Sequence, residues 1–404
     1  REGPVTCIDQ VTVTPRSGGS AKGSGVTLNA SLGQSKIVRG GDGTVYLHCD
    51  VRVSDAPRDV TRQPIDLALV LDTSGSMASA MPLLKRATLG IVERMNPEDR
   101  LTVVTYSNSA RVIYQGPVTG PGMAQLESAV AALVASGGTN ISAGIQAGVN
   151  ALGARLSPSR CGTGIARGGC VPPRPAAATH AKRVLLLTDG LANQGIVDGT
   201  GLGRLVTSLR GRGVALSAMG LGASYNEQLL GSLADSGGGR YHFVDRPEGL
   251  AAVYAAEVDA LRSLVARGAT LTVTPKTGTV VEHVVSWSSS RVRNATRVQL
   301  GDLEQGRSLK VVLRLRLPTH GGSEGSLLEA ADVTLSFVDT ERQVPASLSV
   351  ASLNVAMTTD ALAAAASCDA EVTAAVKEIE VAQFLQKARV EAKAGRQAEA
   401  RRMV

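Results

Sequence analysis

At 404 residues the chain is long enough for about two or three domains, which excludes one small domain. The formal net charge of +7 is spread over scattered arginines, and no basic block resembles a nucleic-acid-binding patch. No apolar run reaches the roughly 18 residues that a membrane-spanning helix needs. We therefore expect no nucleic-acid partner and no membrane span in this segment.

Residues 1–62 have the pattern of β-strands. The segment 44–53, TVYLHCDVRV, alternates from residue to residue, which is the period-two signature of a half-buried strand. One side carries Val45, Leu47, Cys49, Val51 and Val53, and the other carries Tyr46, His48, Asp50 and Arg52. The segment 10–14, QVTVT, predicts a second and weaker strand.

Residues 63–263 alternate between apolar strands and longer helical segments. The predicted strands are 65–71, 100–107, 110–114, 182–190, 213–222 and 239–244, and the predicted helices are 78–95, 123–134, 199–211, 225–236 and 247–263, with one more after Thr139. This order indicates βαβ units and a doubly wound, mostly parallel sheet, because parallel neighbours need a crossover helix. Continuous apolar strands such as VLLL, residues 184–187, fit a sheet covered on both faces.

Residues 264–356 return to short alternating strands. These strands are predicted at 269–274, 282–287, 309–317, 332–338 and 346–355. Turn-rich segments between short strands are typical of a β-sandwich, and we expect the strands before residue 60 to join it. Residues 357–404 then form a helical segment that Gly395 interrupts and that stops uncapped at Val404, so we expect the chain to be cut inside a helical region. Its apolar positions are Val372, Ala375, Val376, Ile379, Ala382 and Leu385.

Two of the five cysteines bracket a glycine-rich loop. Cys161 and Cys170 lie in CGTGIARGGC, and we predict a disulfide there in preference to metal binding, because no histidine is near. A disulfide would indicate an extracytoplasmic location, either secreted, periplasmic or on the cell surface. The pairing of Cys7, Cys49 and Cys368 stays open, with Cys7 and Cys49 able to pair across neighbouring strands.

Three loops at strand ends carry oxygen-bearing side chains. The strand 65–71 delivers Asp72, and Ser74 and Ser76 follow it in a tight turn. Thr139 lies in a glycine-flanked loop before a helix, and Asp189 ends another apolar strand. Because parallel strands end at one edge of a sheet, these five side chains should converge there. Oxygen donors suit a hard divalent cation, most readily Mg²⁺, with Ca²⁺ or Mn²⁺ also possible.

This set resembles the metal-ion-dependent adhesion site of von Willebrand factor A domains. The resemblance covers residues 64–263, fills all five motif positions, and extends to NPEDRLTVVTYS at 96–107 as the family's second strand. It implies a Rossmann-like fold in which Ser74, Ser76 and Thr139 touch the metal while Asp72 and Asp189 act through water. The order of the flanking strands is similar to bacterial proteins related to inter-alpha-trypsin inhibitor heavy chains and to calcium-activated chloride channel homologues. The insertion at 156–181 departs from the family pattern.

The resemblance implies a binding module rather than an enzyme. Only two carboxylates neutralise the cation, so it should attract a carboxylate from a protein ligand, for adhesion or assembly. One alternative is a structural or membrane-associated component in which the metal serves folding. A second is a metal-assisted hydrolase, which needs a general base that the sequence does not place near the metal.

Overall fold

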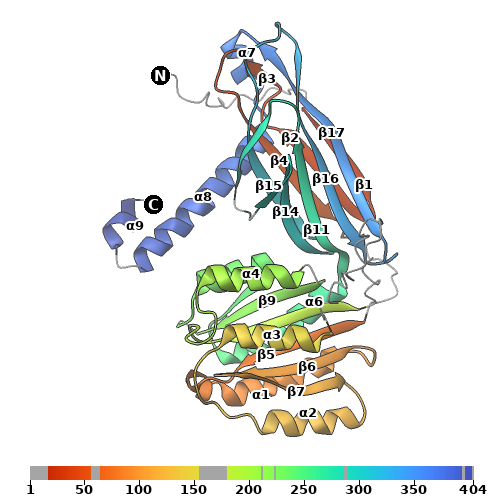
Figure 1. Cartoon of the computed structure of the whole chain (residues 1–404), viewed down its shortest axis with the longest axis vertical. Coiled ribbons are helices and arrows are strands. Elements are labelled where there is room, and N and C mark those ends of the chain that lie inside the picture. Colours follow the sequence, from red (N-terminus) through yellow and green to blue (C-terminus); the bar gives the residue numbers. More distant parts are fainter. Residues whose placement is uncertain are drawn as a thin grey trace, which may run out of the picture.

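The computed structural model describes residues 17–55, 64–153, 180–210, 213–222, 224–285, 287, 289–393 and 396–402. The predicted strand at 10–14, the loop with Cys161 and Cys170, and the break at Gly395 lie outside these residues. Within them the chain forms an α/β domain and a two-sheet β-sandwich, with a helical segment at the end of the chain (Figure 1).

The α/β domain, residues 64–263 and called the A domain below, is built on one six-stranded sheet. Its strands in spatial order are β10 (Gly238–Val244), β9 (Val214–Leu221), β8 (Ala181–Thr188), β5 (Ile65–Asp72), β6 (Arg100–Tyr106) and β7 (Ala110–Pro117). All pairs are parallel except β6 with β7. The predicted doubly wound, mostly parallel sheet is confirmed. The central strands are buried on both faces, which is why their sequences lack alternation.

Helices cover both faces of this sheet. One face packs on α1 (Met81–Gly90), α2 (Pro121–Ala131) and α6 (Leu250–Arg262), and the other on α3 (Ile141–Ala151), α4 (Gly199–Arg210) and α5 (Glu227–Gly237). Short 3₁₀ turns lie at η1 (Gly75–Ala78), η2 (Ile91–Arg94) and η3 (Pro247–Gly249). The helix expected over 78–95 is shorter because Pro82 suits only the first turn, so α1 starts at Met81.

Helix α3 approaches the sheet closely through a glycine. A Cβ atom on Gly144 would lie 2.7 Å from Cδ1 of Tyr106 and 2.9 Å from Cγ1 of Val70. We expect Gly144→Ala to destabilise the domain by about 1–3 kcal/mol, because the ring and the strand would have to move. Gly231→Ala on α5 is the matched control, since its Cβ would meet nothing within 4 Å. Calorimetric melting should show a lower Tm for the first variant and an unchanged or higher Tm for the second.

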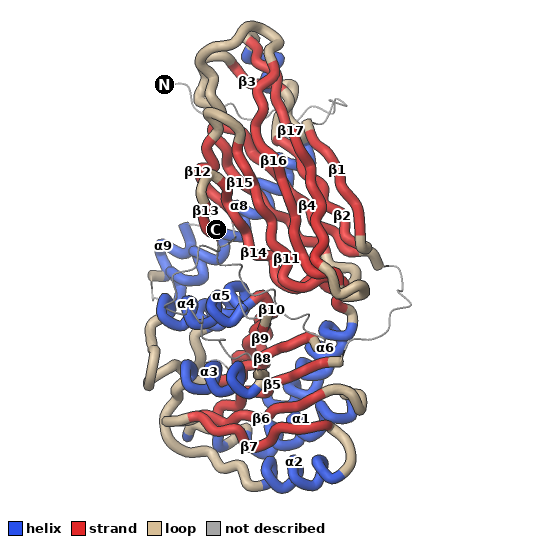
Figure 2. Tube along the Cα trace, turned by 45° about the vertical axis from the view of Figure 1, so that its right-hand side comes forward, coloured by secondary structure: helices blue, strands red, loops and turns tan. Residues whose placement is uncertain are grey.

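Strands from both sides of the A domain form one sandwich (Figure 2). The first sheet orders β1 (Gly18–Gly23), β2 (Val26–Leu32), β4 (Thr44–Val53), β15 (Ser308–Arg316) and β12 (Val280–Val285). The second orders β13 (Ser289–Val292), β14 (Ala295–Glu304), β11 (Leu264–Pro275), β16 (Leu327–Asp339), β17 (Pro345–Thr358) and β3 (Lys36–Val38). Because β4 pairs with β15 and β3 with β17, one core holds residues from both flanks.

The sequence pattern did not predict β13 or β14. Strand β14 contains Gly301, at a φ of +88°, followed by Asp302, and both residue types are depleted in strands. The pairing of β14 with β11 shifts register beside this glycine. The strand forms because β11 and β13, on its two sides, both pair with it, although the sequence of β14 alone does not predict a strand.

The first turns of the helix α8 (Ala370–Lys393), in the helical segment at the end of the chain, cover part of the outer face of the first sheet. This segment also contains α7 (Ala361–Ala365) and α9 (Gln397–Arg402). Val372, Ala375 and Val376 of α8 pack against Val285 and Val312, which explains why the polar side of β4 is buried at His48 and Asp50. The predicted apolar face ends early, since Leu385 is 47% exposed.

Two cysteines in the sandwich have defined states. Cys49 is a buried free thiol, which excludes one of the pairings that the sequence left open, that of Cys7 with Cys49. Burial raises the pKa of the Cys49 thiol, which keeps it in the neutral form. Cys368, just before α8, is disulfide-bonded.

A buried ionic network joins the A domain to the sandwich. Arg183 of β8 is 1% exposed and donates to Glu257 of α6 at 3.3 Å and to Asp302 of β14 at 3.0 Å. The carboxylate of Glu257 also contacts Nε2 of His242 at 2.5 Å and accepts from Ser217 at 2.8 Å.

No helix in the described part of the chain is long and apolar enough to cross a membrane.

Candidate metal site

The end of β5 places three oxygen-bearing side chains in one turn. Asp72 is the last residue of β5, and its Oδ1 accepts the backbone N–H of Ser74 at 2.8 Å. The hydroxyls of Ser74 and Ser76 lie 3.1 Å apart. Ser76 donates to Oδ1 of Asp189, 113 residues further along the chain, at 2.7 Å. The ends of β5 and β8 therefore meet as predicted.

The loop that carries Thr139 is held against this turn. The N–H of Gly75 donates to the carbonyl of Gly137 at 3.1 Å, and the N–H of Ser136 donates to that of Thr73 at 2.7 Å. A Cβ atom built on Gly190 would lie 3.8 Å from both Ser76 Oγ and Thr139 Oγ1. The Thr139 hydroxyl thus faces the same point as the Ser76 hydroxyl, and the structure brings all five predicted residues together.

Asp72 is fully buried and is held by two hydroxyl groups. Its Oδ2 accepts from Thr188 at 2.7 Å and from Tyr106 at 3.3 Å, and its exposed fraction is 0%. Burial raises the pKa of Asp72, and the negative charge of Asp189 raises it further, while the hydrogen bonds from Ser74 and Thr188 oppose the shift. Such a carboxylate gains from a nearby cation.

The sequence reasoning missed Thr188 and Tyr106 as partners of Asp72. Thr188 precedes Asp189 directly, and Tyr106 ends β6 opposite Asp72 in the parallel register. The signal was therefore present in the strand ends, but it depended on knowing that β6 and β8 both lie beside β5. Burial and the charge of Asp72 raise the pKa of Tyr106, so its hydroxyl stays a donor.

Side-chain amides lock the surrounding loops. Asn193 Oδ1 accepts the N–H of Thr139 at 2.8 Å, and Asn108 Oδ1 accepts the N–H of Gly138 at 2.6 Å. Gln194 donates to the same oxygen of Asn108 at 2.9 Å. These contacts fix Thr139 without using its hydroxyl. No local sequence pattern marks the three amides, because they come from two loops that lie far apart in the sequence.

The donor set fits a hard divalent cation. Two carboxylates and three hydroxyls lie together at the ends of β5 and β8 and in the loop before α3, and hard cations prefer oxygen ligands. The described residues contain no group of three or more His, Cys, Asp and Glu side chains that could hold a metal, so a cation at this site would depend on the serine and threonine hydroxyls as well as on the two carboxylates. Ser76 is exposed while Asp72 and Ser74 are buried, so the site opens to solvent on the Ser76 side.

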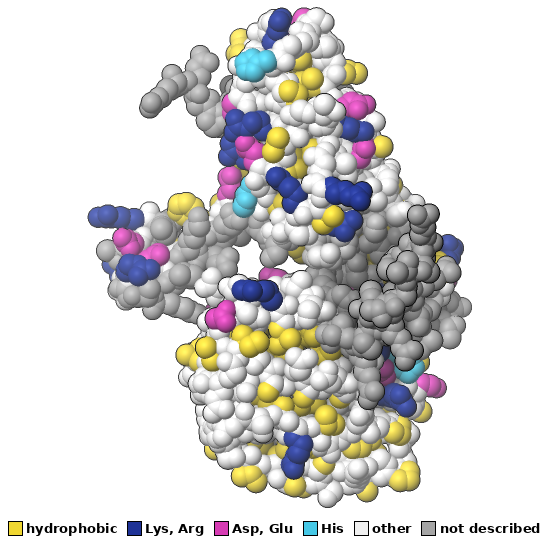
Figure 3. Space-filling model, viewed as in Figure 1, with side chains coloured by type: hydrophobic (Ala, Val, Ile, Leu, Met, Phe, Trp, Pro, Cys, Tyr) yellow, Lys and Arg dark blue, Asp and Glu magenta, His cyan; other side chains and the backbone are white. Residues whose placement is uncertain are grey.

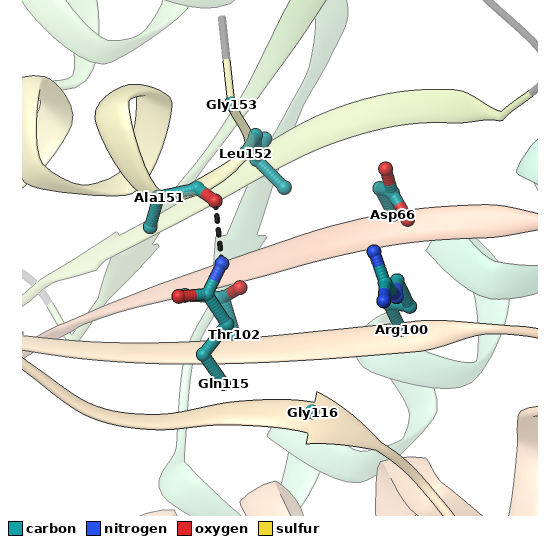
Figure 4. A pocket seen from close by; sticks show the side chains of 8 residues that line it. All are labelled: Asp66, Arg100, Thr102, Gln115, Gly116, Ala151, Leu152 and Gly153. Carbon is teal, nitrogen blue, oxygen red and sulfur yellow. Dashed lines mark hydrogen bonds between the residues drawn. The ribbon is translucent and has the colours of Figure 1, made fainter.

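A cavity of about 400 Å³ lies at the opposite edge of the sheet, shown in Figure 4. Its lining includes Asp66 and Arg100, at the amino ends of β5 and β6, and Gln115, which donates to the carbonyl of Ala151 at 2.6 Å. None of the five predicted residues lines it. We place the candidate site at the carboxyl edge, because oxygen-bearing side chains from the ends of β5 and β8 lie together there and one of them is exposed to solvent.

Comparisons with known proteins agree with this fold. The uncharacterised protein YfbK of Escherichia coli K12 is 27% identical over 287 residues, which are 69% of this chain and 46% of that protein. The chain thus spans less than half of the length of this curated relative.

Two solved structures resemble most of the chain. The von Willebrand factor type A protein from Catenulispora acidiphila has a TM-score of 0.69 at 17% identity, covering 91% of this chain and 82% of that one. The ArnB paralog VWA2 from Sulfolobus acidocaldarius has a TM-score of 0.63 at 18% identity, covering 94% and 87%. These likenesses show a shared fold. The family model of the von Willebrand factor type A domain matches residues 66–256, and the chain therefore carries a von Willebrand factor type A domain between the two sets of sandwich strands.

Proposed function

We propose that the A domain captures a protein partner through a divalent cation at its carboxyl edge. The observation that carries this proposal is the convergence of oxygen donors from three separate loops, with Ser76 bonded to Asp189 and facing Thr139. Domains of this family commonly mediate metal-dependent protein interaction. An acidic group of the partner would complete the coordination, since two carboxylates leave the cation electron-poor.

The burial of the site supports the roles that the family resemblance implies. Asp72 lies behind the turn, at 0% exposure, and suits a carboxylate that acts through water. The hydroxyls of Ser74, Ser76 and Thr139 lie in the loops in front of it and suit direct contact. Mg²⁺ is the cation we favour, because it keeps several waters and is commonly held by few carboxylates. Ca²⁺ and Mn²⁺ remain the alternatives.

Binding is favoured over metal-assisted hydrolysis. A hydrolase would need a general base beside the metal. Among the residues that the structure describes, no histidine hydrogen-bonds to any of the five site residues: His180 contacts Asp66, and His242 contacts Glu257. The disulfide of Cys368 supports an extracytoplasmic location, as would the proposed bond between Cys161 and Cys170.

Ser76→Ala tests the site with little risk to the fold, because the side chain is exposed. We expect about a tenfold weaker affinity for Mg²⁺ by calorimetry, since one hydroxyl ligand is lost. Ser79→Ala, an exposed serine three residues further on, is the matched control and should bind Mg²⁺ like the parent.

A pull-down from the native source, with Mg²⁺ and with EDTA, then tests the function. A partner should be retained by the parent and by Ser79→Ala in Mg²⁺, and be lost in EDTA. Equal retention by Ser76→Ala, with and without EDTA, would show that the interacting surface does not use the metal and would contradict the proposal.

A further inference from the structure

The exposed apolar side chains of the A domain gather near the proposed metal. In its described part, the large apolar side chains with the most exposure are Val112 (39%), Val134 (74%), Leu191 (57%), Ile196 (38%), Val197 (53%) and Phe243 (57%). None of them lies on a helix, and all except Val112 lie in loops or strand ends at the carboxyl edge. Apolar groups that gather on one surface indicate an interaction site, whereas scattered ones do not.

Three aromatic rings form a rigid cluster at this edge. The ring centroid of Tyr225 lies 6.5 Å from those of Tyr241 and Phe243, and the two tyrosine hydroxyls are 2.6 Å apart. A Cβ atom on Gly220 would lie 2.1 Å from the Tyr225 ring. The ring can pack against the end of β9 because glycine has no side chain at this position. Phe243 is exposed to solvent and packs beside Tyr225, whose hydroxyl is hydrogen-bonded to that of Tyr241.

The cluster lies within reach of a ligand bound at the metal. Leu191 follows Asp189 by two residues, and β10, which carries Phe243, is separated from β8 by one strand, or about 10 Å. Gly199, two residues after Val197, approaches Leu229 of α5, which links the loop before α4 to the aromatic side. The strand order therefore places the aromatic side chains at a distance from the metal site that a peptide of a few residues spans.

The proposed metal favours an acidic occupant, because a carboxylate completes the coordination of the cation. Helices α3, α4 and α5 begin at this edge, and their N-terminal N–H groups are already held by Asn140, Asp198 and Asn226. The cation therefore attracts the acidic group, and the apolar side chains around it favour apolar neighbours. Figure 3 shows the neighbouring face of the A domain, which carries α3 and α4 and is a different surface from the carboxyl edge, with hydrophobic side chains and few charged ones.

We propose that an apolar rim, formed by Leu191, Val197, Tyr225, Tyr241 and Phe243, selects the partner by the residues that flank its metal-completing carboxylate. The partner segment then carries Asp or Glu beside an aromatic or large aliphatic residue. This inference rests on the proposed function, because the metal supplies the anchor. The rim supplies the specificity, since a few residues, aromatic ones prominent among them, carry most of the binding energy of an interface.

A random peptide library displayed on phage, panned on the protein in Mg²⁺ and eluted with EDTA, tests the rim. We expect enrichment of peptides in which an acidic residue has an aromatic or large aliphatic neighbour. Enrichment of acidic peptides without that neighbour would overturn the rim while leaving the metal-dependent function intact. Absence of any peptide that EDTA releases would count against both.

Variants of the rim give a second measurement, with a synthetic peptide of the enriched sequence as the probe. Leu191→Ser and Phe243→Ser should each weaken its binding about tenfold, the loss expected for one partly buried apolar side chain. Both should keep the parent's affinity for Mg²⁺. Leu327→Ser, which changes an exposed leucine (67%) of the sandwich, is the control and should bind the peptide normally. Normal binding by both rim variants would overturn the inference.

Discussion

Glu257→Ala is expected to destabilise the protein by about 3–5 kcal/mol, which is a large part of the stability of a domain. Glu257 is 0% exposed and accepts from Arg183, His242 and Ser217. Its removal leaves the guanidinium of Arg183, 1% exposed, with Asp302 as the remaining acidic partner among the described residues. A buried charge that loses a partner is costly, because water cannot replace the partner.

The matched control for this variant lies on the same helix. Asp259→Ala removes a carboxylate that is 54% exposed and lies 3.8 Å from Arg94. We expect a change of within about 0.5 kcal/mol, because exposed ion pairs contribute little. Urea unfolding, followed by circular dichroism, measures both variants. Equal effects of the two substitutions would show that the buried network contributes no more than a surface pair.

The cost of Glu257→Ala should also depend on pH. Burial alone would raise the pKa of Glu257, but the hydrogen bond from His242 and the charge of Arg183 together hold it below its ordinary value. A carboxyl whose pKa is lower in the folded state stabilises the fold above its unfolded pKa and stops doing so as the pH falls through its folded pKa. The stability difference between parent and variant should therefore shrink in acid.

The network also explains what the sequence could not predict. The fold of the A domain could be predicted from the order of its segments, in which apolar strands alternate with helices. Strands such as β5 and β8 are apolar on both faces, and the helices between them are amphipathic, so the two kinds of segment can be told apart. The contact of Arg183 with Asp302 joins residues 119 apart in different domains. No local period records such a pair, and an isolated arginine in an apolar strand is ambiguous until the neighbouring domain is placed.

The proximity of the five residues could be predicted because it follows from the order of the strands in the sheet. Parallel strands end at one edge, so Asp72 and Asp189 had to lie near each other once β5 and β8 were assigned to one sheet. The supporting groups differ. Asn108, Asn193 and Gln194 act through loop conformations that the sequence does not specify, and the exposed position of Phe243 depends on the room that Gly220 leaves for Tyr225.

Asp72→Asn is expected to weaken Mg²⁺ binding by at least about a hundredfold. The substitution keeps the size of the side chain but removes one of the two carboxylate charges at the site. At an effective dielectric constant near 20, a unit charge about 4 Å away contributes on the order of 4 kcal/mol, and desolvation offsets only part of this. Titration calorimetry with MgCl₂ measures the loss directly.

Thermal melting distinguishes this loss of binding from a loss of fold. In EDTA the Tm of Asp72→Asn should stay close to that of the parent, because the buried charge of Asp72 is itself unfavourable without a cation, as its raised pKa indicates. Saturating Mg²⁺ should raise the Tm of the parent and leave that of the variant unchanged. Asp66→Asn, the same change at the other end of β5, should respond to Mg²⁺ like the parent. A Tm increase of equal size in parent and Asp72→Asn would remove Asp72 from the metal site, because a ligand stabilises only the fold that binds it.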